Sequence, residues 1–283
     1  MKVFFLSSLA VSAAVVLSAC AATAPAPETA AKPAPETVSV TFWKGFFDHP
    51  KGYLTRSDGV NAARYLPPPP QMGSEREATD IAIYHKTRAL EGTTRWALAA
   101  QDTEVETPEA PFKAFECALG FRIAPEQAPV LAHLLGAVLP DVEIAQHEVK
   151  STVRPRPYVR EPLPMCISGA ALSRSSSYPS GHSAIGFAWG LILTEIAPDK
   201  GEAIIRRSVA YGESRAVCGF HYISDVEAGR IMGAGLVAGL QSNAKFRSDI
   251  EVAKAEVAAI RETNPARPER CDAEDATLKQ AAY

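Results

Sequence analysis

Two short segments of this 283-residue chain hold side-chain types that suit phosphoryl transfer. The first is the tetrapeptide at residues 179–182, which ends in His182, and the second is residues 214–225, which contain Arg215 and His221. A phosphoryl group in transfer spreads negative charge over its equatorial oxygens, so positioning and electrostatic stabilisation dominate its catalysis. Arginine supplies planar, bidentate donors for such oxygens. The two segments therefore predict a site that binds and transfers a phosphoryl group.

The groups beside the two histidines predict different roles for them. A neutral imidazole can attack phosphorus, and a second imidazole can protonate the departing alkoxide. Asp225 follows His221 by four residues. A carboxylate bonded to the far ring nitrogen would fix the tautomer and stabilise the imidazolium-like product. We therefore predict that His221 is the nucleophile, that Asp225 orients it and that His182 is the general acid.

This chemistry needs no metal ion and no other cofactor, and the sequence predicts neither. The remaining histidines of the expected domain stand at no metal-ligand spacing, and we expect them to be ordinary polar residues; they are His49, His85, His133 and His147.

Both segments are predicted to lie where helices begin or end. Residues 183–194 form an apolar run that is typical of a buried helix. The first N–H groups of a helix are unpaired and lie at the positive end of its dipole, so they bind anions. Gly181 would let a phosphate approach the backbone closely. Asp225 likewise marks the start of a helix over about 225–241, and Arg215 lies near the end of the preceding helix.

The whole chain is predicted to be all-α, with one domain that forms a helical bundle. Apolar residues recur at helical spacing, and no run alternates in the way that strands do. Gly229, Gly233 and Gly239 would give one helix a thin face for close packing. The expected helices cover residues 75–101, 124–137, 141–150, 182–196, 200–217, 225–241 and 243–262.

These ordered motifs resemble the bacterial class A non-specific acid phosphatases, which belong to the superfamily of type 2 phosphatidic acid phosphatases and vanadium haloperoxidases. The superfamily signature has three parts: Lys, six residues, Arg-Pro; then Pro-Ser-Gly-His; then Ser-Arg, five residues, His, three residues, Asp. The second part is intact at residues 179–182 and the third at 214–225. Neighbouring stretches are also similar, and the resemblance spans about residues 50–240.

The resemblance implies an acid phosphatase that hydrolyses small phosphate monoesters through a phosphohistidine on His221, with phosphotransfer to alcohols as a side activity. It implies that His182 first donates a proton to the leaving group and then activates water. It also implies a phosphate-binding set, which consists of Arg156, Ser180, Gly181 and Arg215.

The first part of the signature departs from the pattern. Residues 156–157 supply Arg-Pro, but Val149 stands where the lysine belongs, and the nearest lysine is Lys150. On a helix, a shift of one residue turns a side chain by about 100°. The long stem of Lys150 compensates if the helix ends early, and Pro155 favours an irregular end. We expect Lys150 to reach the phosphate. The alternatives are that Arg154 supplies the second charge, or that the site has one cation fewer.

The N-terminus has the pattern of a bacterial secretion signal. Residues 1–19 contain Lys2 and then an apolar run, and they lead into a lipobox that ends at Cys20. We expect lipidation of Cys20, so that the periplasmic protein contacts a membrane only through this anchor; ordinary cleavage and secretion is the alternative. Residues 20–40 are rich in alanine and proline and predict a semi-extended tether. The helical phosphatase domain is expected over residues 41–262.

Four cysteines remain after Cys20, and an oxidising compartment favours up to two disulfides among them, in any of three pairings. They are Cys117, Cys166, Cys218 and Cys271. Residues 263–283 are polar and predict a loosely ordered tail unless Cys271 pins it.

The formal net charge of −3 gives no support for binding to nucleic acid. The expected partners are small phosphomonoester substrates, and the sequence leaves open whether the chain forms a homo-oligomer. Two other functions stay open. One is a haloperoxidase-like enzyme with vanadate on His221, and the other is a non-catalytic surface lipoprotein whose site has decayed.

Overall fold

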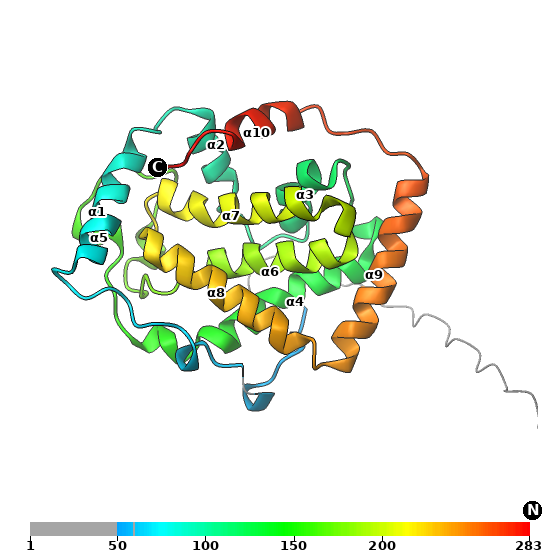
Figure 1. Cartoon of the computed structure of the whole chain (residues 1–283), viewed down its shortest axis with the longest axis horizontal. Helices are drawn as coiled ribbons and strands as arrows, with labels where there is room; N and C mark the ends of the chain where they lie inside the picture. Colours follow the sequence, from blue (N-terminus) through cyan, green and yellow to red (C-terminus); the bar gives the residue numbers. More distant parts are fainter. Residues whose placement is uncertain (1–49, 59) are drawn as a thin grey trace, which may run out of the picture. The chain divides into compact units, whose positions relative to one another are not determined.

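The computed structural model describes residues 50–58 and 60–283, and within these ranges it is all-α, as predicted (Figure 1). The predicted signal peptide, the lipidation site Cys20 and the tether lie outside the described residues. The α-helices are α1 (Glu75–Arg88), α2 (Thr94–Gln101), α3 (Ala110–Leu119), α4 (Pro129–Gln146), α5 (Pro157–Arg160), α6 (Gly181–Ile196), α7 (Gly201–Val217), α8 (Ile223–Leu240), α9 (Ala244–Glu262) and α10 (Cys271–Leu278). The 3₁₀-helices are η1 (Arg56–Asp58), η2 (Ala62–Arg64), η3 (Pro125–Gln127), η4 (Val149–Ser151), η5 (Ala170–Leu172) and η6 (Pro198–Lys200). Within the described ranges, no helix is both long and apolar enough to cross a lipid bilayer.

Helix α6 lies at the centre of the bundle, with α7, α8 and α4 packed around it (Figure 1). Most of its apolar run is therefore covered, and Ile185, Trp189 and Ile192 are buried. Each such side chain contributes about 1.5–3 kcal/mol when it leaves water. The indole N–H of Trp189 donates to the main-chain oxygen of Leu135 in α4 at 2.7 Å. The helix that carries the tetrapeptide of residues 179–182 is thus held rigidly.

Glycines of α8 let this helix approach the first turns of α6. A Cβ atom at Gly229 would lie 2.4 Å from the main-chain oxygen of Ser180, and one at Gly233 would lie 2.5 Å from that of Ala184. The predicted thin face is confirmed at these two positions, whereas Gly239 instead lies against Val60. The close approach brings the start of α8 to the N-terminus of α6.

The stretch expected as one helix over residues 75–101 is two helices, α1 and α2. Gly92 has a φ of +79°, a left-handed conformation that breaks the helix. Thr93 then caps α2, because its side chain accepts a hydrogen bond from the N–H of Trp96. Local turn chemistry therefore overrides the helical periodicity.

The break expected between residues 137 and 141 was wrong, because α4 continues through Pro140. Proline inside a helix costs about 3 kcal/mol. Leu139 and Val142, on either side of it, are buried in the core and contribute about 1.5–3 kcal/mol each. Packing therefore offsets the hydrogen bond that Pro140 cannot make.

Two disulfides join the four cysteines, as expected in number. One joins Cys117 to Cys271, and the other joins Cys166 to Cys218. The first attaches α10 to α3, so Cys271 does pin the C-terminal residues, and Ala282 near the end of the chain is buried. The second joins the loop before α6 to the end of α7, next to the segment that contains His221.

Candidate active site

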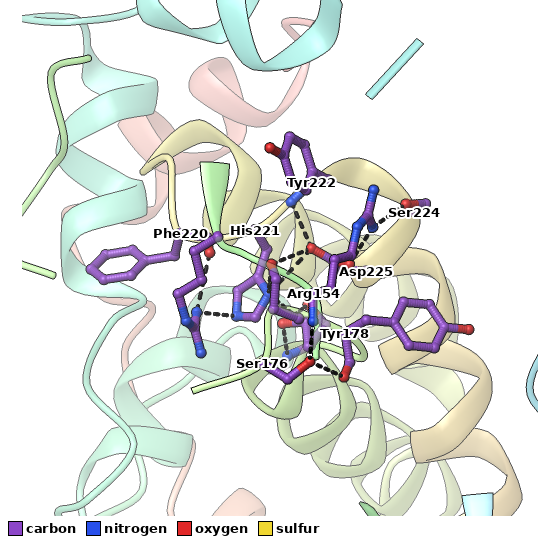
Figure 2. A network of polar contacts seen from close by, with 12 residues as sticks. Arg154, Ser176, Tyr178, Phe220, His221, Tyr222, Ser224 and Asp225 are labelled. Carbon is purple, nitrogen blue, oxygen red and sulfur yellow. Dashed lines mark hydrogen bonds and ion pairs between the residues drawn. The ribbon is translucent and has the colours of Figure 1, made fainter. Parts of the chain in front are cut away.

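The two sequence segments meet where α6 and α8 begin. The N–H of Ser180 donates to the main-chain oxygen of Asp225 at 2.9 Å, so the tetrapeptide and the α7–α8 junction are bonded directly. Figure 2 shows His221 and Asp225 side by side at this junction, with Arg154 and Ser176 from the preceding loop against them. The site is thus built from a helix N-terminus, a helix junction and one long loop.

The ring of His221 is held at both nitrogens. Its Nδ1 lies 2.8 Å from the main-chain oxygen of Ser177, and its Nε2 lies 3.0 Å from Nη1 of Arg156. A carbonyl oxygen only accepts hydrogen bonds, so the proton of the neutral ring is on Nδ1. The lone pair is therefore on Nε2, which faces the Arg156 guanidinium. This is the nitrogen that can act as a nucleophile.

Asp225 lies behind His221 but is not its hydrogen-bond partner. Its Oδ2 is 3.7 Å from Nδ1, an ion-pair distance, so the direct hydrogen bond expected from the sequence is replaced by the Ser177 carbonyl. The reason is that the backbone at Ser177 passes closer to the ring than the carboxylate does. Oδ2 instead accepts hydrogen bonds from the Ser177 hydroxyl at 2.5 Å and from the N–H of Tyr222 at 2.9 Å.

Arg154 is fully engaged in a buried network, so it does not supply the second phosphate-binding charge that the sequence left open. Its Nη2 donates to Oδ2 of Asp80 at 2.7 Å, and its Nη1 donates to Oδ1 of Asp225 at 2.5 Å. Asp80, in α1, also accepts from the N–H of Ser224 at 3.0 Å. Arg154 thus connects Asp80 to the carboxylate behind His221.

Sequence reasoning missed Asp80. It lies four residues before Tyr84 and seven before Thr87, and all three are buried on one face of α1. A carboxylate on the apolar face of a helix needs a buried partner, and this spacing was the signal that could have revealed it.

Arg215 is the strongest indication of an anion site. Its side chain is buried, yet Nε and Nη1 have no hydrogen-bond partner among the residues that the structure describes. The guanidinium lies over the ring of Phe220, 4.3 Å from the ring centroid. Burial lowers the pKa of Arg215 to about 10. Buried charged donors without partners are costly, and an anion would satisfy them.

Lys150 lies close enough to His221 to interact with it electrostatically, despite its shifted position in the sequence. Helix α4 ends at Gln146, and the 3₁₀-helix η4 then carries Lys150 with a tighter turn than an α-helix has. Its Nζ donates to the main-chain oxygen of Ser176 at 2.8 Å. Burial, and then the charge of Arg156, lower the pKa of Lys150 to about 8.

Ser180 and Gly181 form the start of α6, as predicted. The hydroxyl oxygen of Ser180 caps the helix by accepting from the N–H of Ser183 at 3.3 Å and from its hydroxyl at 2.8 Å. Its own proton remains available to an anion. A Cβ atom at Gly181 would lie 3.1 Å from Oε1 of Gln146, so a glycine here also makes room for that side chain.

His182 follows on the first turn of α6. Its Nε2 lies 3.1 Å from the main-chain oxygen of Thr103, a partner that the sequence did not predict. Because a carbonyl only accepts, Nε2 carries the proton of the neutral ring. Burial, and then the charge of Arg215, hold the pKa of His182 well below its usual value. Burial, and then Arg156, do the same to the pKa of His221.

The structure also contains a separate cleft of about 650 Å³, which lies beside α3 and α7 and is lined by neither His182 nor His221. Asp102, Arg207 and Tyr211 are among its lining residues. Within the described ranges, no group of three or more His, Cys, Asp or Glu residues is arranged to hold a metal ion.

Comparison with known proteins agrees with this fold. The family model for the PAP2 superfamily matches residues 130–247, which include both histidines. An acid phosphatase from Zymomonas mobilis is 40% identical over 203 residues, covering 70% of this chain and 75% of that protein. A non-specific acid phosphatase from Providencia stuartii is 37% identical, covering 74% and 86% of the two chains, and one from Salmonella typhimurium is 33% identical, covering 71% and 81%. The chain therefore belongs to the PAP2 superfamily and, within it, to the bacterial non-specific acid phosphatases, which confirms the family predicted from its motifs.

Proposed function

We propose that the protein hydrolyses small phosphate monoesters by transferring the phosphoryl group first to Nε2 of His221 and then to water. The observation that carries this proposal is the buried guanidinium of Arg215, whose Nε and Nη1 lack a partner among the described residues. It interacts electrostatically with both His182 and His221. An anion that satisfies Arg215 would thus lie near both the proposed nucleophile and the proposed acid.

In the first step, Nε2 of His221 attacks phosphorus, and the bond from phosphorus to the ester oxygen breaks. The Nδ1 proton stays on the ring, hydrogen-bonded to the Ser177 carbonyl, and Asp225 behind it stabilises the positive charge that develops. His182 donates a proton to the departing oxygen. The negative charge of the bound phosphate raises the pKa of His182, so the acid is protonated when substrate is present.

In the second step, water attacks phosphorus and the bond from phosphorus to Nε2 breaks. Neutral His182 accepts a proton from this water, and inorganic phosphate forms. An alcohol in place of water would give a new phosphate ester, which accounts for the proposed phosphotransferase side activity. Arg156, Arg215, Lys150, the Ser180 hydroxyl and the N–H of Gly181 would hold the phosphate oxygens.

The electrostatics of the site support work at acidic pH. A free histidine is largely protonated below its pKa of about 6.5 and then has no lone pair with which to attack. Burial and the charges of Arg156, Lys150 and Arg215 lower the pKa of His221, so its ring stays neutral at lower pH. The nucleophile therefore remains active where an ordinary histidine would not.

The location of the enzyme is a further part of the proposal. The lipobox that ends at Cys20 supports a periplasmic protein anchored to a membrane by lipid. Metabolic labelling with a radioactive fatty acid tests it, with Cys20→Ala as the control; equal labelling of both proteins would contradict lipidation at Cys20.

The direct test of the mechanism is hydrolysis of a chromogenic phosphomonoester from pH 4 to 8, combined with rapid quenching to trap phosphoenzyme. We expect an acid optimum that a chelator does not change, and an acid-labile phosphoenzyme that disappears in His221→Ala together with activity. His85→Ala is the matched control, because His85 is exposed and pairs with Glu161 at the surface. Activity that survives in His221→Ala would exclude the phosphohistidine. Halide oxidation on addition of vanadate would instead support the haloperoxidase alternative.

A further inference from the structure

The proposed general acid is oriented by a main-chain carbonyl rather than by a side chain. Nε2 of His182 lies 3.1 Å from the oxygen of Thr103, which is in the connection between α2 and α3. This contact fixes the proton on Nε2, so the other nitrogen, Nδ1, exchanges the proton with the substrate. Thr103 lies outside the helices, so the position of its carbonyl depends on the contacts that hold the neighbouring residues Asp102 and Glu104. The orientation of His182 therefore depends on these two neighbours.

Helix α7 holds both neighbours of Thr103. Arg207 donates to Asp102 with two nitrogens, Nη1 to Oδ2 at 3.1 Å and Nη2 to Oδ1 at 2.5 Å. One turn further along α7, the hydroxyl of Tyr211 donates to the main-chain oxygen of Glu104 at 3.2 Å. Residues four apart share a face of a helix. Two residues on one face of α7 thus hold the backbone on both sides of the Thr103 carbonyl.

The pair of Arg207 and Asp102 is buried and supported from its far side. Nε of Arg207 donates to Oε1 of Glu274 in α10 at 3.1 Å, and the Cys117–Cys271 disulfide attaches α10 to α3. α10 lies beside α2 and α3 (Figure 1). Since Arg207 touches two buried carboxylates and is almost inaccessible to solvent, its geometry has little freedom.

We propose that Arg207 and Tyr211 are positioning residues for the general acid, because they fix the Thr103 carbonyl that orients His182. The inference rests on the proposed role of His182 and extends it to residues that touch neither substrate nor phosphate. The Thr103 carbonyl also raises the pKa of His182, against the effects of burial and Arg215. A displaced carbonyl would therefore reduce the protonated fraction of His182 and also change the orientation of its ring.

The test exploits the fact that a general acid matters most when the leaving group is poor. The values of kcat/KM are compared for two substrates. The leaving group of p-nitrophenyl phosphate needs little protonation, whereas the leaving group of an alkyl phosphate needs much. A positioned acid contributes about 10²–10⁴-fold. We expect Arg207→Met to lower the alkyl-to-aryl ratio about tenfold or more, and Tyr211→Phe to lower it in the same direction by a smaller factor.

Arg206→Met is the matched control, since Arg206 is exposed and pairs only loosely with Asp275 at 3.6 Å. It should leave the ratio unchanged. The inhibition constant of inorganic phosphate should stay near the wild-type value in all three variants, because the phosphate-binding residues are untouched. If Arg207→Met fails to fold, Tyr211→Phe decides the question, because it removes one hydroxyl only.

An unchanged alkyl-to-aryl ratio in folded Arg207→Met and Tyr211→Phe would overturn the inference. So would a fall in activity matched by an equal rise in the phosphate inhibition constant, because the network would then support phosphate binding. His182→Ala separates this failure from that of the proposed function. If His182→Ala itself leaves the ratio unchanged, His182 is not the acid, and the proposed mechanism fails with it.

Discussion

The Nδ1 atom of His221 is 2.8 Å from the main-chain oxygen of Ser177. The carbonyl decides which ring nitrogen carries the proton, and so directs the lone pair of Nε2 toward the Arg156 guanidinium. Asp225 acts from behind, through the hydroxyl of Ser177 and at 3.7 Å from the ring. The proposed nucleophile is therefore oriented by a backbone segment, and the carboxylate of Asp225 holds that segment in place.

This arrangement predicts that Asp225 and Ser177 contribute unequally to turnover. Asp225→Asn removes the charge that stabilises the imidazolium and holds Ser177, and we expect kcat to fall on the order of 10²-fold. Ser177→Ala keeps the carbonyl and loses one charge-assisted hydrogen bond of about 1.5–3 kcal/mol. We expect it to lower kcat about tenfold. Steady-state kinetics measure both, and a wild-type kcat in Ser177→Ala would contradict the bridging role.

Asp80 is predicted to stabilise the fold through Arg154. Both partners are buried, and removal of one member of a buried ion pair costs about 3–5 kcal/mol. Asp225 still pairs with Arg154, so Asp80→Ala should lower the free energy of unfolding by about 2–4 kcal/mol. Glu227→Ala is the control, because Glu227 pairs with Arg76 at the surface, and it should cost less than about 1 kcal/mol. Urea unfolding measures both variants, and an equal loss of unfolding free energy in Asp80→Ala and Glu227→Ala would refute the prediction.

Lys150 is predicted to contribute its charge to phosphate binding below about pH 8, where its ammonium is protonated. A charge-assisted hydrogen bond is worth about 1.5–3 kcal/mol. Lys150→Met should therefore raise the inhibition constant of inorganic phosphate at pH 6 about tenfold or more. In the wild type this constant should rise above about pH 8, and the variant should lack that rise. An unchanged constant at pH 6 would remove Lys150 from the site.

The stability of the fold should depend on the ionisation of Lys150 in the opposite direction: phosphate binding weakens as the pH rises, whereas stability increases. Its pKa is lowered from 10.5 to about 8 in the fold, so between these values the unfolded chain binds more protons. The contribution of Lys150 to stability therefore rises as pH increases through this window. Below pH 8 the buried charge is a constant penalty, and Lys150→Met should be more stable than the wild type there. Thermal unfolding at pH 6 and pH 10 measures the difference in Tm between Lys150→Met and the wild type. The same difference at both pH values would contradict the prediction.

The two disulfides are predicted to serve stability and activity differently. The Cys117–Cys271 bridge spans 154 residues and the Cys166–Cys218 bridge spans 52. Chain entropy assigns them about 5 and about 4 kcal/mol. Replacing the first pair with serines should cost more stability and increase hydrogen exchange in α10. Replacing the second pair should impair phosphate binding more, because Cys218 lies between Arg215 and His221 in the chain. The reverse ranking in unfolding and inhibition measurements would refute both assignments.

The sequence by itself determined the helical fold, the helices from residue 182 to residue 262 and the two motifs. These properties depend on local spacing: apolar residues recur every three to four positions, and His221 and Asp225 share one helix junction. Gly229 and Gly233 also predicted a thin face, because a missing side chain is visible in the sequence itself.

Only the tertiary structure decided what lies behind the histidines. Asp80 meets Arg154 across 74 residues, and the contacts to Ser177 and Thr103 are made by carbonyl oxygens, which every residue possesses. No residue type marks such a contact in advance. The continuity through Pro140 and the choice among three disulfide pairings likewise depended on packing between distant segments. The types of the site's side chains could thus be predicted from the sequence. The carbonyl oxygens and the buried ion pair that orient these side chains depend on the tertiary structure.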